Sequence, residues 1–135
     1  MSAPTSFTTV WTPRVLSVLR IITAFLYMAH GTQKLLGYPP GTGIPFELMT
    51  LRGASGILEA FGGGLILLGL FTRPVAFLLS GHMAFAYFIS HAPANFWPIL
   101  NRGELAIMFC FVFLYLSAAG GGPWSLDHVL RRDKS

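Results

Sequence analysis

Four apolar segments limit what this chain can fold into more than any other feature. They cover about residues 14–36, 53–71, 74–90 and 103–119, and a helix that crosses a bilayer needs roughly 17–25 residues. Only 10% of the residues are charged and 53% are apolar, whereas a soluble domain has about 25% charged residues. We therefore expect an all-α membrane protein, a four-transmembrane-helix bundle that forms a single integral membrane domain over residues 1–135.

Threonine, glycine and proline mark the expected helix ends. Thr12 and Pro13 are typical of a helix start, because threonine caps a helix and proline fits its first turn. Gly37 and the prolines after it predict where this helix ends. We expect residues 37–52 to form a loop with a short interfacial helix, and the segment before Arg102 to lie at the interface. The link 72–74 is so short that the helices on either side of it are predicted to be antiparallel neighbours.

The distribution of basic residues predicts the topology. One side of the membrane would hold six of them and the other side three: Arg14, Arg20, Arg73, Arg131, Arg132 and Lys134 against Lys34, Arg52 and Arg102. The positive-inside rule then places both termini in the cytoplasm. The first apolar run is too long for the core of a cleaved signal and is expected to remain as a helix. No basic run is interleaved with aromatic residues, so nucleic acid is not an expected partner.

A polar stripe runs along the first apolar segment. Arg20, Thr23, Tyr27, His30 and Lys34 follow one another at spacings of 3, 4, 3 and 4 residues, which places them on one face of an α-helix. An ionisable side chain inside a membrane costs roughly 2.5–3.5 kcal/mol on insertion scales and normally faces the interior of a helix bundle. The stripe is therefore the best indication of a functional site.

Other ionisable residues fall at a similar depth, toward the non-cytoplasmic side. Glu59 lies inside the second apolar segment and Glu104 at the start of the fourth. We take Glu59, Lys34 and Glu104 as candidate catalytic residues, and we expect Lys34 to pair with Glu59 because an unpaired buried charge is costly. The candidate ligand-binding residues are Tyr27, His30, His82, Arg102 and Asn101.

Several of these residues also have a structural explanation. Arg20 is expected to extend to the cytoplasmic interface, and the same behaviour would account for Lys34 and Arg102 near helix ends. Two interpretations of His82 stay open: a hydrogen-bonded histidine of the core, or a ligand that binds haem or a metal together with His30. We assign no metal site. The single cysteine, Cys110, excludes an intrachain disulfide and a C-x-x-C dithiol mechanism.

Two further helix faces are distinctive. Gly53, Gly56, Ala60 and Gly63 form a stripe of small residues, which allows membrane helices to approach closely. The fourth segment has a face that begins with Glu104 and continues with Met108, Phe111 and Tyr115. That face would suit a quinone ring or tail, or simply the core.

Three stretches of the sequence are similar to the DoxX family of small bacterial four-helix membrane proteins. They are HGTQKLLGY, GILEAFGGGLILLGLFTRPVA and NRGELAIMFCFVFLYLSAAGGGPWSLD, and their order and spacing carry the resemblance from about Arg20 to Asp127. The residues that match the family pattern are Gly31, Lys34, Leu35, Glu59, Gly62, Gly63, Gly69, Thr72, Arg73, Asn101, Glu104, Ser125 and Asp127.

The resemblance implies a membrane subunit of an oxidoreductase system, with a quinone as the candidate cofactor. The family takes its name from a subunit of a thiosulfate:quinone oxidoreductase, although this chain has no cysteine pair for thiol chemistry. Besides the lipid bilayer, a redox partner protein or further copies of the chain are the implied partners. A non-catalytic membrane scaffold or assembly factor is the first alternative, and a small-solute carrier is the second. The residues leave open whether the chain is an enzyme by itself.

Overall fold

The computed structural model describes residues 6–41 and 49–132. Its first helix, α1 (Phe7–Leu36), is 30 residues long and begins earlier than expected. Ser6, not Thr12, is the N-cap, and its hydroxyl accepts a hydrogen bond from the Thr9 amide at 3.2 Å. Pro13 therefore lies inside the helix rather than in its first turn. The end is as predicted, because Gly37 adopts a left-handed conformation with φ 69°.

The remaining described elements are also helical. α2 (Leu51–Ile57), a π-helical turn η1 (Leu58–Gly62) and α3 (Gly63–Leu68) follow one another without a break, and so do α4 (Thr72–Ala86) and a second π-helical turn, η2 (Tyr87–His91). The short α5 (Pro98–Asn101) precedes α6 (Glu104–Ala119), and α7 (Leu126–Arg132) comes last. The interfacial helix expected within 37–52 falls largely on residues 42–48, outside the described part of the chain.

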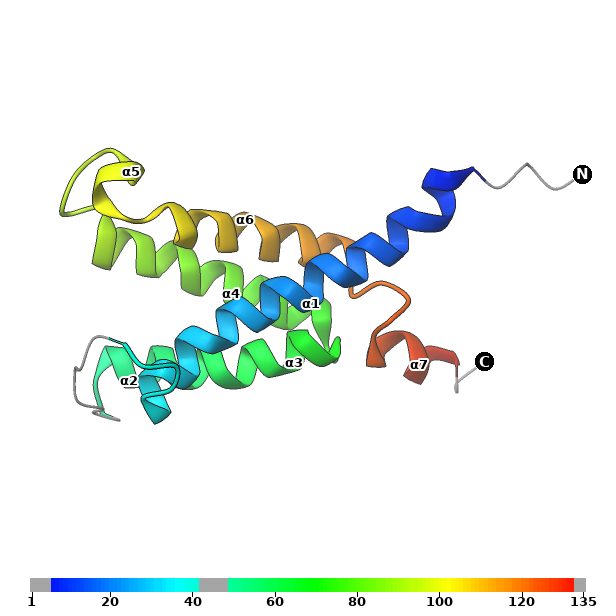
Figure 1. Cartoon of the computed structure of the whole chain (residues 1–135), viewed down its shortest axis with the longest axis horizontal. Coiled ribbons are helices and arrows are strands. Elements are labelled where there is room, and N and C mark those ends of the chain that lie inside the picture. Colours follow the sequence, from blue (N-terminus) through cyan, green and yellow to red (C-terminus); the bar gives the residue numbers. More distant parts are fainter. Residues whose placement is uncertain (1–5, 42–48, 133–135) are drawn as a thin grey trace, which may run out of the picture.

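Figure 1 shows α4 and α6 side by side and α1 running obliquely across the bundle. α1 packs along α2, η1 and α3, while α4 packs along α6, and the largest buried apolar side chains between them are Tyr27, Ile66, Leu79, Phe113 and Leu116. The small-residue stripe allows the close approach that we predicted. A Cβ on Gly31 of α1 would come within 2.4 Å of the Ala60 amide nitrogen, and one on Gly63 within 2.9 Å of the Met28 side chain.

The outer surface of the molecule is apolar, as expected for contact with lipid. Among the described residues, two helical segments are long and apolar enough to cross a membrane, α1 and Leu51–Leu68, and α6 is apolar but shorter. The α6 face that would suit a quinone points outward, because Met108, Phe111 and Tyr115 are 61%, 63% and 55% exposed. That face therefore does not contribute to a site inside the bundle.

The prediction that Arg20 reaches the interface is wrong. Its side chain is only 1% exposed, because residues 120–132, called the C-terminal segment below, fold back against α1. The guanidinium donates hydrogen bonds to the carbonyl oxygens of Gly121, Trp124 (2.8 Å) and Leu67 (3.5 Å). Carbonyl oxygens from the C-terminal segment and from α3 thus replace the water that an interfacial arginine would contact.

Candidate functional site

A cavity of about 700 Å³ lies between α1, α2, η1, α4, η2 and α6; we call it the central cavity. Most of its lining is apolar, with Met83 and Phe109 as buried members. The ionisable and hydroxyl side chains in its lining are Tyr27, His30, Lys34, Arg52, Ser55, Glu59, His82, Ser90, His91 and Arg102. The central cavity therefore combines apolar walls with a set of polar and ionisable side chains.

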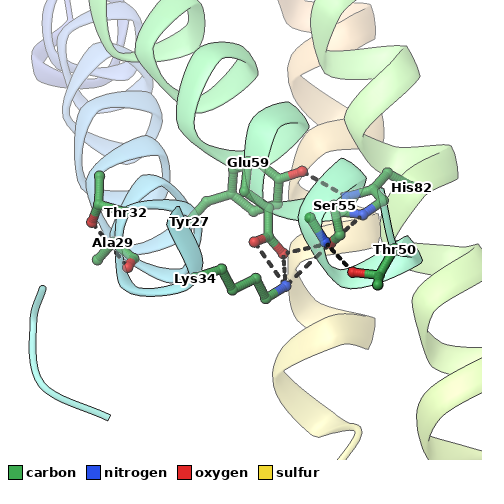
Figure 2. A network of polar contacts seen from close by, with 9 residues as sticks. Tyr27, Ala29, Thr32, Lys34, Thr50, Ser55, Glu59 and His82 are labelled. Carbon is green, nitrogen blue, oxygen red and sulfur yellow. Dashed lines mark hydrogen bonds and ion pairs between the residues drawn. The ribbon is translucent and has the colours of Figure 1, made fainter. Parts of the chain in front are cut away.

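The expected pair of Lys34 and Glu59 is present. The Nζ of Lys34 is 2.8 Å from one carboxylate oxygen of Glu59 and 2.9 Å from the other (Figure 2). Glu59 is only 3% exposed, so its charge is balanced by the ammonium rather than by water. Such a buried pair is stable only when the remaining hydrogen-bonding capacity is also satisfied.

Ser55, which the sequence analysis did not select, connects this pair to a histidine. Its Oγ is 3.1 Å from the Lys34 Nζ, 3.3 Å from a Glu59 oxygen and 3.0 Å from His82 Nε2. On the other side of the ring, His82 Nδ1 is 2.8 Å from the Tyr27 hydroxyl. Figure 2 shows the resulting chain of contacts from α1 through α2 and η1 to α4. The spacing from Ser55 to Glu59, one helical turn, is the signal that could have identified the serine.

With Ser55 donating to Glu59, one assignment of donors and acceptors satisfies every contact. Ser55 accepts from the lysine and donates its single proton to Glu59. The His82 Nε2–H must then donate to Ser55, and in a neutral ring Nδ1 accepts from Tyr27. Protons can therefore be passed in order along a continuous path between the tyrosine and the carboxylate.

Both described π-helical turns border the central cavity. η1 contributes Leu58 and Glu59, and η2 contributes Ile89, Ser90 and His91. π-helical turns are rare in proteins as a whole, but those that occur are often found at functional sites. Their presence in the lining of one cavity marks this part of the bundle as the candidate site.

Only some of the other predicted site residues line the central cavity. His30 and Arg102 line the cavity although both are largely exposed, and the His30 ring lies edge-on to Phe109 at 6.1 Å between centroids. Glu104 is exposed and is not part of the lining. Asn101 is buried and bonds to the Tyr87 hydroxyl, the Asn95 carbonyl and the Gly103 amide instead of facing the cavity. Within residues 6–41 and 49–132, no group of three or more His, Cys, Asp or Glu side chains could hold a metal ion.

A long apolar first helix, an apolar surface and a buried ion pair are features of a helical membrane protein. The family model described as DoxX matches residues 15–92, which is more than half of the chain. The chain therefore belongs to the DoxX family of membrane proteins.

Two relatives have no assigned activity. The chain is 42% identical to an uncharacterized protein of Haemophilus influenzae over 123 residues, covering 86% of this chain and 90% of that protein. It is 29% identical over 133 residues to an uncharacterized membrane protein of Mycobacterium tuberculosis, covering 84% of this chain and 80% of the relative. No solved structure matches the chain.

Proposed function

We propose that this chain is a membrane subunit of an oxidoreductase system and that its central cavity binds the head group of a quinone. The observation that carries the proposal is the hydrogen-bonded path from Tyr27 through His82 and Ser55 to Glu59, placed in the wall of an apolar cavity. If the pair of Lys34 and Glu59 were purely structural, it would not need the further hydrogen bonds through His82 to Tyr27.

The size and lining of the cavity support a ligand of this kind. Sites for small organic ligands measure about 300–1,000 Å³ and combine apolar walls with a few polar groups, and this one measures about 700 Å³. Met83 and Phe109 offer apolar contact for a flat ring, and the ring nitrogens of His30, in the same lining, offer hydrogen bonds. When bound, a quinone accepts electrons and protons; in this proposal the electrons come from a partner oxidoreductase.

The residues of this chain would supply the proton. In the state that delivers a proton, Glu59 is protonated and neutral His82 carries its proton on Nδ1, so the hydrogen bonds run from Glu59 to Ser55, from the serine to Nε2, and from Nδ1–H to Tyr27. When Tyr27 gives its hydroxyl proton to the ligand, it takes the proton from Nδ1, Nε2 takes one from Ser55, and Ser55 takes one from Glu59. One proton thus leaves the path at Tyr27, and the ionised Glu59 is left to take up the next one. Lys34 would stabilise negative charge that develops next to it.

The proposal includes the arrangement in the membrane. All four long helical segments cross the bacterial inner membrane, with both termini in the cytoplasm, and the central cavity lies in the non-cytoplasmic half. Two observations support this arrangement. Six basic residues fall on the side of the termini and three on the other side. The apolar side chains on the outside of α4 and α6, such as Phe77 and Phe111, are exposed and suit contact with lipid.

The test is quinone binding to the purified protein in lipid nanodiscs, measured by calorimetry with a short-tailed ubiquinone. Glu59→Gln keeps the shape of the side chain but removes its charge, and it should weaken binding by about tenfold, the effect of losing roughly 1.4 kcal/mol. Glu104→Gln is the matched control, because the same change is made at an exposed carboxylate outside the cavity. It should leave affinity within about twofold.

Equal affinity in the wild type and Glu59→Gln would overturn the role of the path. No measurable binding to the wild type would overturn the proposed ligand. A Glu59→Gln variant that unfolds at lower temperature but binds with unchanged affinity would favour the scaffold alternative.

A further inference from the structure

The mouth of the central cavity has an unbalanced positive charge. Lys34 is neutralised by Glu59, but Arg102 also lines the cavity, and no ion pair joins it to a carboxylate in the part of the chain that the structure describes. Arg102 is exposed, whereas Glu59 and Tyr27 are buried. The arginine therefore lies at the open end of the cavity and the hydrogen-bonded path at its deep end.

The backbone at Arg102 is strained. Its φ is 61°, in the left-handed region that glycine and asparagine adopt more easily, and other residues pay about 1–2 kcal/mol there. Such strain persists only where surrounding contacts maintain it and is concentrated at functional sites. A long cationic side chain is therefore placed at a position where its backbone conformation is unfavourable.

Neighbouring residues hold this turn in place. The Asn101 side chain bonds to the Gly103 amide at 2.8 Å and to the Tyr87 hydroxyl at 3.2 Å. The Asn101 carbonyl lies 3.0 Å from His91 Nδ1, and His91 itself lines the cavity. Asn101, predicted to bind a ligand, instead positions Arg102 and His91 at the mouth.

Apolar side chains surround the same opening. Leu51, Phe85, Ile89 and Leu105 all line the cavity and are 72%, 56%, 49% and 48% exposed. A free inorganic anion would gain nothing from these side chains. A ligand with an acidic head and an apolar chain would contact both the arginine and the apolar wall.

We propose that the mouth of the central cavity binds an anionic amphiphile, with its acidic head group on Arg102 and its apolar chain along Phe85, Ile89 and Leu105. An anionic phospholipid and a free fatty acid share this chemistry. The proposal goes beyond the quinone site and does not depend on it, because it concerns different residues at the other end of the cavity.

The experiment is native mass spectrometry of the full chain released from a neutral maltoside detergent. The probes are phosphatidylglycerol, oleate, phosphatidylcholine and inorganic phosphate. Arg102→Asn removes the charge and suits the left-handed backbone, Arg102→Lys keeps the charge, and Arg14→Asn removes an exposed arginine that does not line the cavity.

We expect the wild type to bind one phosphatidylglycerol or one oleate, and Arg102→Asn to bind it about tenfold more weakly, as for the loss of a charged hydrogen bond. Arg102→Lys should retain part of the affinity, and Arg14→Asn should match the wild type. Because asparagine relieves the strain, Arg102→Asn should melt no lower than the wild type, so weaker binding would not reflect unfolding.

Binding of either anionic probe alone supports the site and identifies its source, a membrane lipid or a free acid. Equal binding of phosphatidylcholine, equal loss in Arg14→Asn, unchanged binding in Arg102→Asn, or binding of inorganic phosphate alone would overturn the proposal. This experiment varies Arg102 and uses anionic amphiphiles, whereas the quinone titration varies Glu59, so the outcome of either one leaves the other standing.

Discussion

The backbone N–H of Thr72 donates a 2.9 Å hydrogen bond to Oδ2 of Asp127, although 55 residues separate the two positions. The other carboxylate oxygen accepts from the Phe71 amide at 2.8 Å. Phe71 occupies the N-cap position of α4 and has no side chain able to cap it. The C-terminal segment therefore supplies the cap that α4 lacks locally, and the stability of α4 depends on that segment.

Asp127→Asn should lower the free energy of unfolding by about 1 kcal/mol, the usual effect of a lost helix cap. Burial acts to raise the pKa of Asp127, but the hydrogen bonds from Thr72 and Phe71 and the nearby Arg131 outweigh it, so the pKa lies below its ordinary value of 3.8. The stabilisation is therefore complete above that ordinary value and is lost as the pH falls below it.

Melting temperatures of the wild type and Asp127→Asn in detergent provide the measurement. Their difference should be constant near neutral pH and should shrink as the pH falls from about 5 to 3. A difference that stays constant over this range would contradict a stabilising role for the charged carboxylate.

Replacing Arg20 should be among the most destabilising changes in the chain. Arg20→Met has a similar length but removes the guanidinium that donates to the carbonyl oxygens of Gly121, Trp124 and Leu67, of which only the Gly121 oxygen keeps a side-chain donor, Ser17. A buried acceptor that loses its donor costs about 1–3 kcal/mol. Arg14→Met, an exposed position on the same helix, should change stability by less than about 0.5 kcal/mol. Unfolding in detergent and denaturant would compare them, and equal stability would mean that Arg20 does reach the interface.

Gly31→Ala should separate α1 from the helix beside it. The new Cβ would lie 2.4 Å from the Ala60 amide nitrogen and 2.8 Å from the Gly56 carbonyl oxygen, and neither backbone group can move alone. We expect a loss of about 1–3 kcal/mol, typical of overpacking. Gly81→Ala is the control, because no atom lies within 4 Å of its new Cβ and alanine favours a helix. If both variants melted at the same temperature, the close approach of α1 would not exist in the membrane.

The proposed topology can be tested with introduced cysteines after Cys110 has been changed to alanine. Gly41→Cys should react with a membrane-impermeant maleimide in intact cells, because the loop after α1 is placed outside. Thr8→Cys, near the start of α1, should react only after the cells are permeabilised. The reverse pattern would invert the proposed orientation.

The part of the site that follows helical spacing was predictable from the sequence. The polar stripe of α1 and the pair of Lys34 and Glu59 depend on local periodicity and on the cost of burying a single charge. The contact of Arg20 with Gly121 joins residues 101 positions apart, and no local pattern records such a contact. Ser55 was missed because a serine is inexpensive to bury and becomes informative only beside Glu59 and His82. The outward face of α6 was ambiguous because that helix is apolar all round.

The carbonyl oxygens that surround Arg20 belong to the main chain, so no point mutation at Leu67, Gly121 or Trp124 can delete an acceptor. An arginine that pairs with a carboxylate can be tested by exchanging the two side chains. That test is not possible for these contacts, because the acceptors are main-chain oxygens. As far as Arg20 is concerned, the side chains of Leu67 and Trp124 are free to diverge during evolution as long as the backbone keeps its path. Around this arginine, selection therefore acts on one side chain and on the shape of a loop, whereas Asp127 of the C-terminal segment must keep its carboxylate to cap α4.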